Sequence, residues 1–387
     1  MLVQYPGQLT ESQAVSQNRN QEKMAEMVRL ITQRGPKIDE IARDIGVYKE
    51  TVRYWYNAML KNGFTIQASR NHEKLGMKRV VLLAELSEVF REYADAIFYA
   101  LGELAYIVGF SKTLPDGYYI LNASVPTECL NSWSEFMGKL KTMGIFSTID
   151  SIEMDWVRNV PMWADYFNFQ TGTWEFDWNN KKANPIEVDV EPGQRVKYDA
   201  TDLRILEQLQ INADTPLVEI CKKVGAANYK TLAWHYKRHV SGRGLIRGYQ
   251  LNWTGAKYDF VSEKPIHRKH RYMWVDLIAN GVTDEVKFGL MDKLHQTPFM
   301  WLEAGGPGSF YSRMVFPTDD MPEALEFLEG AVSLARGKVR FFHMDQAHAL
   351  YFTMPNRFYD EENQSWAFNG ADLLTRFEAL VQKIGEG

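Results

Sequence analysis

Two segments of the chain carry side chains that can form hydrogen bonds with nucleic-acid bases at the spacing of one helix face. In the first segment Lys49, Arg53 and Asn57 recur every four residues, and Val52 and Tyr56 fall on the opposite side. A helix would therefore direct the first three outward and the other two inward. Arginine suits guanine, asparagine suits adenine, and lysine serves bases or phosphates. The spacing predicts an exposed base-reading face, to which Tyr48 and Glu50 also belong.

The second segment lies about 180 residues later and has the same layout with different side chains. Its helix is predicted to begin near Asn228. Arg53 corresponds to Ala233 and Asn57 to Lys237, so the two faces would read different bases. We interpret the aromatic residues Tyr54 and Trp234 as core residues rather than base-stacking groups. The predicted contacts of the second helix are Asn228, Tyr229, Lys230 and Lys237.

A helix, a glycine-containing turn and a second helix position each set of side chains. The turns are centred on Gly46 and Gly225, within segments 38–56 and 217–236. This is the helix-turn-helix pattern of DNA-binding proteins, whose second helix enters the major groove. Basic residues that follow the second helices are expected to meet phosphates. These are Lys61, Arg70, Arg243 and Arg247.

The charge distribution agrees with this interpretation, although the net charge of the chain is −5. Residues 19–80 carry 13 Lys and Arg against 7 Asp and Glu, and residues 197–272 carry 14 against 7. The rest of the chain is strongly acidic. A polyanion at both basic windows is therefore favoured over an evenly solvated surface.

The segment after each helix-turn-helix alternates strands and helices in the order β-α-β-β-α-β, which is the ferredoxin-like unit. An α+β fold with two such repeats is therefore predicted. The expected elements of the first unit are strand 78–86, helix 89–104, strands 105–110 and 117–125, helix 128–143 and strand 146–154. Those of the second are strand 272–278, helix 283–296, strands 298–303 and 309–316, helix 320–335 and strand 338–344.

The length of 387 residues and the repeat imply several domains. Aromatic extensions at 163–178 and 351–368 are interpreted as covers for sheet edges or interfaces. The predicted division is a flexible arm 1–19, helix-turn-helix 20–77, ferredoxin-like domain with extension 78–178, linker 179–196, helix-turn-helix 197–256, and ferredoxin-like domain with extension and C-terminal helix 257–387.

The chain resembles the Lrp/AsnC family of archaeal and bacterial transcription regulators. The resemblance rests on segments 198–209 and 244–249 in the second copy, and on 63–68 and 73–76 in the first. It implies a regulator of transcription that binds double-stranded DNA. Since family members carry one unit per chain and pair into dimers, two units in one chain imply a covalent pseudo-dimer. Its unlike recognition helices favour an asymmetric DNA site.

The resemblance also implies a small effector, commonly an amino acid, bound near two loops of the α/β domains. The residues concerned are Asp116, Gly117, Gly305, Gly306 and Gly308. Hairpin geometry alone also explains these glycines. The spacing of 305–308 does not match a phosphate-binding loop. The same α/β domains could assemble further into homo-oligomers.

Other signals are weak. Cys129 and Cys221 are interpreted as reduced thiols, and no run is apolar enough to span a membrane. With no secretory layout at its start, the chain is expected to be cytoplasmic. His343 and His348 would face opposite sides of a strand, which disfavours a metal site. We therefore expect no cofactor and no metal.

Two alternatives to a DNA-binding regulator stay open. The sirohaem (siroheme) decarboxylases of haem biosynthesis resemble the same arrangement and use it for porphyrin chemistry, although their substrate-binding pattern is not found in this sequence. The helix-turn-helix units could also bind proteins of the transcription machinery. The basic windows favour DNA, so the sequence predicts a regulator without catalytic activity.

Overall fold

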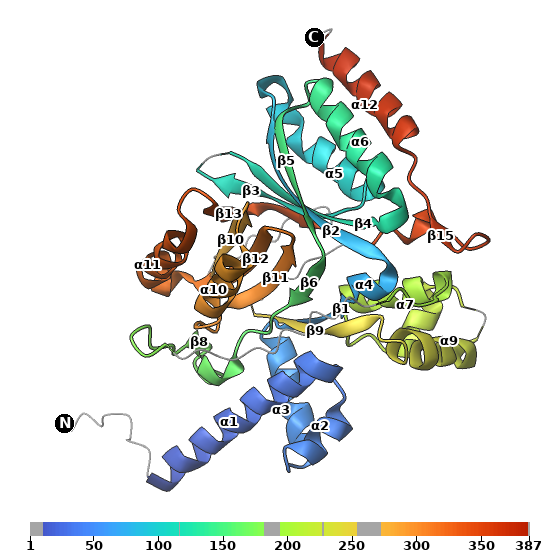
Figure 1. The fold of residues 1–387 in the computed structure, drawn as a ribbon. Helices are drawn as coiled ribbons and strands as arrows, with labels where there is room; N and C mark the ends of the chain where they lie inside the picture. Colours follow the sequence, from blue (N-terminus) through green and yellow to red (C-terminus); the bar gives the residue numbers. More distant parts are fainter. Residues whose placement is uncertain (1–10, 116, 182–193, 227, 254–271, 386–387) are drawn as a thin grey trace, which may run out of the picture.

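The computed structural model describes residues 11–115, 117–181, 194–226, 228–253 and 272–385. The fold is α+β, as the sequence predicted. A large sheet forms the centre, helices cover its outer face, and two helical lobes lie at one end (Figure 1). None of the described helices is both long enough and apolar enough to cross a membrane.

The first lobe contains three helices and a strand. They are α1 (Glu11–Arg34), α2 (Ile38–Asp44), α3 (Lys49–Lys61) and β1 (Thr65–Arg70). Met27, Ile31, Ile41 and Val52 are fully buried between the helices. Apolar residues three, four and seven positions apart thus hold α3 against α1 and α2, and they leave its opposite face free.

The second lobe repeats this order with a change in its last helix. Its elements are α7 (Ala200–Ile211), α8 (Leu217–Lys223), α9 (Tyr229–His235), a π-helical turn (Tyr236–Ser241) and β9 (Ile246–Asn252). Strand β9 pairs with β1 of the first lobe in antiparallel register, from Thr65 opposite Asn252 to Arg70 opposite Ile246. The two lobes are therefore joined by a shared two-stranded sheet.

The central sheet has nine strands in the order β5-β2-β4-β3-β13-β10-β12-β11-β6. Its first half is made of β2 (Met77–Leu86), β3 (Ile107–Leu114), β4 (Tyr119–Pro126) and β5 (Phe146–Met154). Its second half is made of β10 (Tyr272–Asn280), β11 (Met300–Gly306), β12 (Ser309–Pro317) and β13 (Val339–Tyr351). Strand β6 (Trp156–Asn159) completes it.

The sheet closes into a barrel because its two outermost strands are consecutive in the chain. Only Asp155 separates β5 from β6, and β6 pairs with β11 of the second half. A buried carboxylate, Glu303 on β11, accepts hydrogen bonds from Arg158 on β6 and pairs with His295, whose Nε2 lies 2.9 Å away. The ion pair between Arg158 and Glu303 therefore stabilises the contact of β6 with the second half of the sheet.

Alternate residues of the strands divide between two cores. Val80 and Leu82 of β2 pack beneath the outer helices, whereas Val81 and Leu83 join the core that contains the second half. The outer helices of the two halves are α5 (Ala94–Leu104), α6 (Leu130–Thr142), α10 (Asp284–Leu294) and α11 (Met321–Val332). Side chains at positions 79, 81 and 83 therefore point into the barrel.

Each aromatic extension covers the opposite half of the molecule. The first forms a small hairpin, β7 (Phe167–Asn168) with β8 (Thr173–Trp174), and continues to Trp178, whose ring lies 5.8 Å from that of Phe299 in the second half. The second extension forms β14 (Tyr359–Asp360) and β15 (Ser365–Trp366), and Ala367 accepts a 2.8 Å hydrogen bond from Tyr106 of the first half. The extensions thus clamp the two halves together.

The remaining elements are short or terminal. Helix α4 (His72–Leu75) links the first lobe to β2, and α12 (Gly370–Gly385) packs against α6. Short 3₁₀ turns occupy Glu88–Tyr93, Thr127–Cys129, Ala164–Tyr166, Thr318–Asp320, Ser333–Ala335 and Asn356–Phe358.

One strand is longer than the sequence predicted. Strand β13 runs to Tyr351 rather than ending near residue 344, with an irregularity between Asp345 and Ala349. The reason is a partner from the other half, because residues 343–351 pair with β3. Local patterning predicts strands but not which distant strand supplies the hydrogen bonds.

Candidate active site

The inner face of the barrel carries charged and polar side chains at the end nearest the two lobes. Arg79 occupies the inward position of β2, and Asn122 and Ser124 occupy neighbouring inward positions of β4. Asn122 reaches across the barrel, where its Nδ2 lies 3.3 Å from the hydroxyl oxygen of Tyr311 on β12. The two halves therefore meet at a buried polar layer.

Two side chains from the first lobe extend this layer. Arg70, at the end of β1, donates from Nε to Nε2 of His72 over 3.2 Å and from Nη2 to Oγ of Ser124 over 2.7 Å. His72, the first residue of α4, also lies 2.9 Å from Ser124 Oγ and 3.4 Å from a terminal guanidinium nitrogen of Arg79. We call Arg70, His72, Arg79 and Ser124 the cation cluster; all four are buried.

Burial and mutual repulsion shape the electrostatics of the cation cluster. Burial, together with the charge of Arg79, lowers the pKa of Arg70 to about 9, and burial lowers that of Arg79 to about 10. Burial and the neighbouring guanidinium groups lower the pKa of His72 well below its ordinary value. His72 is therefore neutral at pH 7, and the two arginines remain charged.

The cation cluster has no carboxylate among the hydrogen-bond and ion-pair partners found for the described residues. The nearby Glu73 pairs with Arg247 instead, at 3.2 Å. Within the same described part, Nε of Arg79 and Nδ1 of His72 are buried without a hydrogen-bond partner. Two buried positive charges without a countercharge are costly, so this place suits an anionic ligand.

In the adjoining hydrogen-bond network on the second half, each buried charge has a partner of opposite charge. Asp276 on β10 accepts two hydrogen bonds from Arg313 on β12, at 2.6 and 2.7 Å, and a third from Tyr311 at 2.8 Å. Burial alone would lower the pKa of Arg313, but the charge of Asp276 raises this pKa above its ordinary value. Arg313 also donates to the hydroxyl of Tyr351 at 2.7 Å. This pair forms a rigid wall beside the cation cluster.

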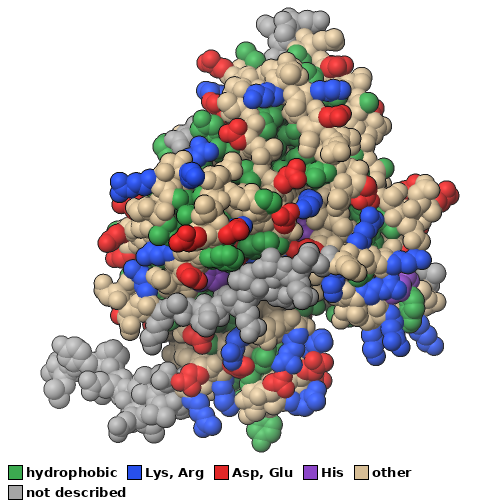
Figure 2. Space-filling model, viewed as in Figure 1, with side chains coloured by type: hydrophobic (Ala, Val, Ile, Leu, Met, Phe, Trp, Pro, Cys, Tyr) green, Lys and Arg blue, Asp and Glu red, His purple; other side chains and the backbone are tan. Residues whose placement is uncertain are grey.

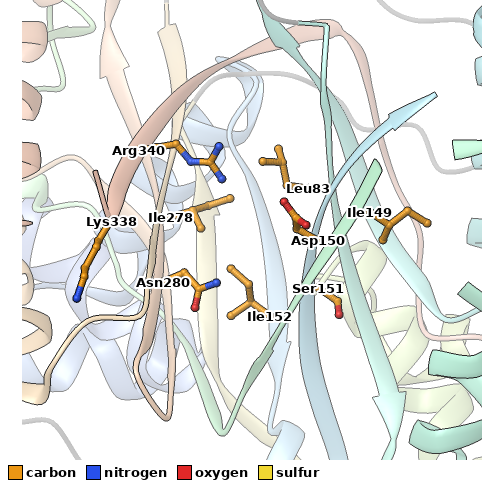
Figure 3. A pocket seen from close by; sticks show the side chains of 9 residues that line it. All are labelled: Leu83, Ile149, Asp150, Ser151, Ile152, Ile278, Asn280, Lys338 and Arg340. Atoms are coloured by element: carbon orange, nitrogen blue, oxygen red, sulfur yellow. The ribbon is translucent and has the colours of Figure 1, made fainter. Parts of the chain in front are cut away.

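A cavity of about 350 Å³ lies between the two halves of the sheet. This volume is at the lower end of the range for small-molecule sites. Figure 3 shows Leu83, Ile152 and Ile278 directed toward the middle together with Asp150, whereas Ile149 and Ser151 lie on the other side of β5. Its lining residues are Leu83, Ile149, Asp150, Ser151, Ile152, Ile278, Asn280, Lys338 and Arg340. Leu83 and Arg79 both face inward on β2, four residues or about 13 Å apart.

The structure places the predicted base-reading residues of the first lobe on the exposed face of α3. Tyr48 caps the helix and is 86% exposed, and Lys49, Glu50, Arg53, Asn57 and Lys61 are also exposed. Val52 and Tyr56 are buried, as predicted. Two of the exposed cations already have carboxylate partners, Lys49 with Asp39 at 2.9 Å and Arg53 with Glu50 at 2.8 Å.

The second lobe exposes Tyr229, Lys230 and Lys237 in the same way, and Figure 2 shows basic side chains gathered on both lobes. Asn228 is exposed but uses its side chain to cap α9, since its Oδ1 accepts a 2.8 Å hydrogen bond from the amide of Thr231. Basic side chains thus gather on both lobes.

Two predictions need correction, the surface position of Arg70 and the burial of Tyr54 and Trp234, whereas the phosphate contacts of Arg243 and Arg247 stay predictions. Arg70 is buried in the cation cluster and cannot contact a phosphate at the surface. Arg247 is half-buried and donates to the carbonyl of Val157 at 2.9 Å. Tyr54 and Trp234 are 72% and 52% exposed, so they are not core residues; the buried aromatic positions of α3 are Trp55 and Tyr56. Arg243 is half-buried and donates to the carbonyl of Lys197.

The glycines predicted to contact an effector have packing reasons of their own. A side chain at Gly305 would meet the ring of Trp156 at 2.6 Å, and one at Gly306 would meet the carbonyl oxygen of Glu153 at 2.4 Å. Gly117 and Gly308 have positive φ values of 72° and 64°, as hairpin turns require. Asp116 lies outside the described residues.

The sequence reasoning missed the cation cluster. Its signal was a charged residue at an inward position of an apolar strand: Arg79 in 78–86, and likewise Asp276 and Arg313 in their strands. His343 lies on the regular part of β13, opposite Leu114, whereas His348 lies in the irregular part and pairs with Asp345 at 2.7 Å.

Two solved structures share the fold over almost the whole chain. The crystal structure of siroheme decarboxylase NirDL aligns with 92% of this chain and 99% of its own, with a TM-score of 0.52 and 10% identity. NirDL in complex with an iron-uroporphyrin III analogue aligns with 87% of this chain and 97% of its own, with a TM-score of 0.51 and 9% identity. At these identities the likeness concerns the fold.

Regulators align over a smaller part. An AsnC family transcriptional regulator from Agrobacterium tumefaciens aligns with 34% of this chain and 87% of its own, with a TM-score of 0.28 and 14% identity. No family model matches the chain, and no curated protein sequence matches it.

The expectation of a chain without catalytic activity is overturned by the likeness to NirDL. The same tandem architecture, aligned over 99% of the other chain, is that of an enzyme. Two helix-turn-helix lobes on an α/β body are therefore no reason to exclude catalysis, because fold and function are separable.

Proposed function

We propose that this chain is an enzyme that binds a carboxylated tetrapyrrole in its barrel and removes a carboxyl group from it. The observation that carries the proposal is the cation cluster, in which Arg70 and Arg79 are buried without a carboxylate partner among the described residues. The likeness to a siroheme decarboxylase over almost the whole chain supports a tetrapyrrole as the substrate class.

The cation cluster has the chemistry to bind substrate carboxylates. Guanidinium groups form strong, geometrically defined hydrogen bonds with carboxylates, and these are strongest where water is excluded. An anion beside Arg70 and Arg79 would offset the repulsion between the two guanidinium groups and the free-energy cost of burying their charges. Leu83, Ile152 and Ile278 give the otherwise polar cavity an apolar part, which would adjoin the flat face of a macrocycle.

His72 is placed to supply the proton that decarboxylation needs. Loss of CO₂ from an acetate side chain breaks the bond between its two carbons, and the bonding pair stays on the methylene carbon. That carbon then takes one proton and becomes a methyl group. Because Nε2 of His72 accepts from Arg70, the proton of the neutral ring resides on Nδ1, which has no partner in the described structure. In this mechanism Arg70 and Arg79 hold carboxylates. His72 passes its Nδ1 proton to the methylene carbon while Nε2 takes the proton that Arg70 donates to it, so the ring stays neutral and Arg70 regains a proton from solvent.

A titration followed by visible absorbance tests the binding step. Iron-uroporphyrin III, added to the full chain, is expected to give a saturable shift of its Soret band. Arg79→Met should weaken the apparent affinity at least tenfold, because it removes one carboxylate anchor. Arg91→Gln is the matched control, since Arg91 is an exposed arginine of the same half. Absence of a saturable shift, or equal affinity of both variants, would contradict the proposal.

DNA binding is a second candidate, favoured by the exposed cations of both recognition helices. Lys49, Arg53, Lys230 and Lys237 lie on exposed helical surfaces, and the unlike residues of the two helices favour an asymmetric site. Selection from random DNA tests this candidate. Enrichment of one asymmetric sequence would support it, and perfect palindromes or no enrichment would count against it.

A further inference from the structure

A second cluster of titratable side chains lies in the second lobe, away from the barrel. Asp199 and Asp202, at the start of α7, face His235 of α9 and His239 of the π-helical turn. Nδ1 of His235 lies 2.9 Å from Asp202 Oδ1 and 3.5 Å from Asp199 Oδ2, and Nδ1 of His239 lies 3.0 Å from Asp202 Oδ2. Four potential ligand atoms thus lie within 4.8 Å of one another.

These distances fit tetrahedral coordination. Zinc binds imidazole nitrogen and carboxylate oxygen at roughly 2.0–2.2 Å, so the ligand atoms of a tetrahedral site lie about 3.3–3.6 Å apart. The three separations between a histidine nitrogen and a carboxylate oxygen are 2.9–3.5 Å, and all four ligand atoms lie within 4.8 Å of one another. Both imidazoles direct the same nitrogen, Nδ1, to the carboxylate of Asp202.

The carboxylate at the centre of the cluster belongs to Asp202, which is fully buried. Its Oδ2 accepts a 3.0 Å hydrogen bond from the amide of Asp199 in the capping box of α7, and the side chains that contact it in the described structure are the two histidines, without a lysine or arginine. Buried carboxylates without a positive partner are costly unless they pair with a cation or coordinate a metal. Asp199 is 45% exposed, which gives an ion a path from solvent.

The first lobe provides an internal comparison. With Thr51 aligned to Thr231, the positions of His235 and His239 correspond to Trp55 and Met59, which are buried apolar residues. The second lobe thus replaces an apolar contact by two imidazoles and a carboxylate. The π-helical turn that follows His235 is also specific to this lobe, and π-turns are frequent at functional sites.

We infer that Asp199, Asp202, His235 and His239 bind one divalent transition-metal ion, and the nitrogen and oxygen ligands favour Zn²⁺. The ion would replace the hydrogen bonds between the histidines and Asp202, and it would join α7 to α9. Because metal binds the folded lobe, its binding stabilises that lobe.

Metal analysis of the full chain tests this inference. Protein stripped with a chelator and dialysed against Zn²⁺ is expected to retain one ion per chain and to melt at a higher temperature than the stripped protein. Co²⁺ in place of Zn²⁺ should give the visible absorption bands of a tetrahedral site. The double variant His235→Gln, His239→Gln is expected to lose the ion and the bands.

Two further variants keep the test decisive. Asp199→Asn retains an oxygen that can cap α7 as Asp199 does, so it should fold normally and bind Zn²⁺ at least tenfold more weakly. His348→Gln removes an exposed histidine of the barrel and should leave binding unchanged. Retention of no ion by the natural chain, or retention by the double variant equal to that of the natural chain, would overturn the inference and leave the cluster as hydrogen bonds only.

Discussion

A guanidinium nitrogen of Arg79 lies 3.4 Å from Nε2 of His72 inside the barrel, and both side chains are buried. Arg79 comes from the central sheet and His72 from the helix that links the sheet to the first lobe. Their contact places a positive charge beside a neutral imidazole, and Arg70 adds a second charge. The fold thus concentrates positive charge where a substrate anion would be held.

Replacement of Arg79 by methionine should increase stability while it weakens substrate binding. Methionine fills much of the same space and removes a buried charge that repels Arg70. We expect an increase of about 1–2 kcal/mol in the free energy of unfolding, measured by denaturant titration. A structural role of Arg79 would give the opposite sign, a loss of stability.

The pKa of His72 predicts a specific loss of stability in acid. The folded chain keeps His72 neutral, whereas the unfolded chain binds a proton below about pH 6.5. The unfolding free energy should therefore fall as the pH drops from about 6.5 toward the lower folded pKa. In His72→Asn this part of the pH dependence should disappear, as denaturant titrations at pH 7 and pH 5 would show. An unchanged slope would mean that His72 is protonated in the folded chain.

Removal of the carboxylate of Asp276, which neutralises Arg313 in the second half of the barrel, should lower the stability of the chain strongly. Asp276→Asn leaves Arg313 buried without its carboxylate, which costs about 3–5 kcal/mol. Glu85→Gln breaks the more exposed pair with Arg91 and should cost less than about 1 kcal/mol. Similar losses in the two variants would show that the Asp276–Arg313 pair does not hold the barrel wall.

The barrel closure can be tested at Gly306. A methyl group there would lie 2.4 Å from the carbonyl oxygen of Glu153 on β5. The backbone would have to shift, so we expect Gly306→Ala to lower stability by about 1–3 kcal/mol. Gly138→Ala, on an outer helix with open space around it, should not lower stability. A neutral effect of Gly306→Ala would favour a ligand-binding reason for this glycine.

If the lobes bind DNA, the affinity should depend steeply on salt. Neutralisation of six to eight phosphates would give a slope of about −5 to −7 in log K against log salt. Arg53→Ala and Lys230→Ala should each reduce affinity for the selected site by about 1–3 kcal/mol. Glu103→Gln, which changes a charge on outer helix α5, away from both lobes, is the control. A flat salt dependence would leave the lobes as a scaffold or a protein-binding surface.

Much of the fold could be predicted because periodic patterns are local. The inward positions of Val52 and Tyr56 follow from helix spacing, and strand 146–154 matches β5 residue for residue. The closure of the sheet could not be predicted in the same way. It depends on pairing between β6 and β11, about 145 residues apart, as Arg158 and Glu303 show.

The site was harder to predict than the fold. Arg70 follows a recognition helix in sequence and was assigned to phosphate, yet β1 directs it into the barrel beside Ser124, 54 residues later. The charge total of a segment does not distinguish an exposed arginine from a buried one. Trp234 errs in the opposite direction, because its aromatic ring predicts a core residue, yet the ring packs 4.6 Å from that of His239 and remains half exposed.

The most direct test of the central claim is incubation of the purified chain with siroheme, followed by mass analysis of the tetrapyrrole. We predict loss of CO₂ from the substrate by the natural chain, a strong reduction with Arg79→Met and His72→Asn, and full activity with Arg91→Gln. Unchanged siroheme after incubation with a chain that binds it, or equal turnover by all variants, would contradict the assignment of the cation cluster as the active site.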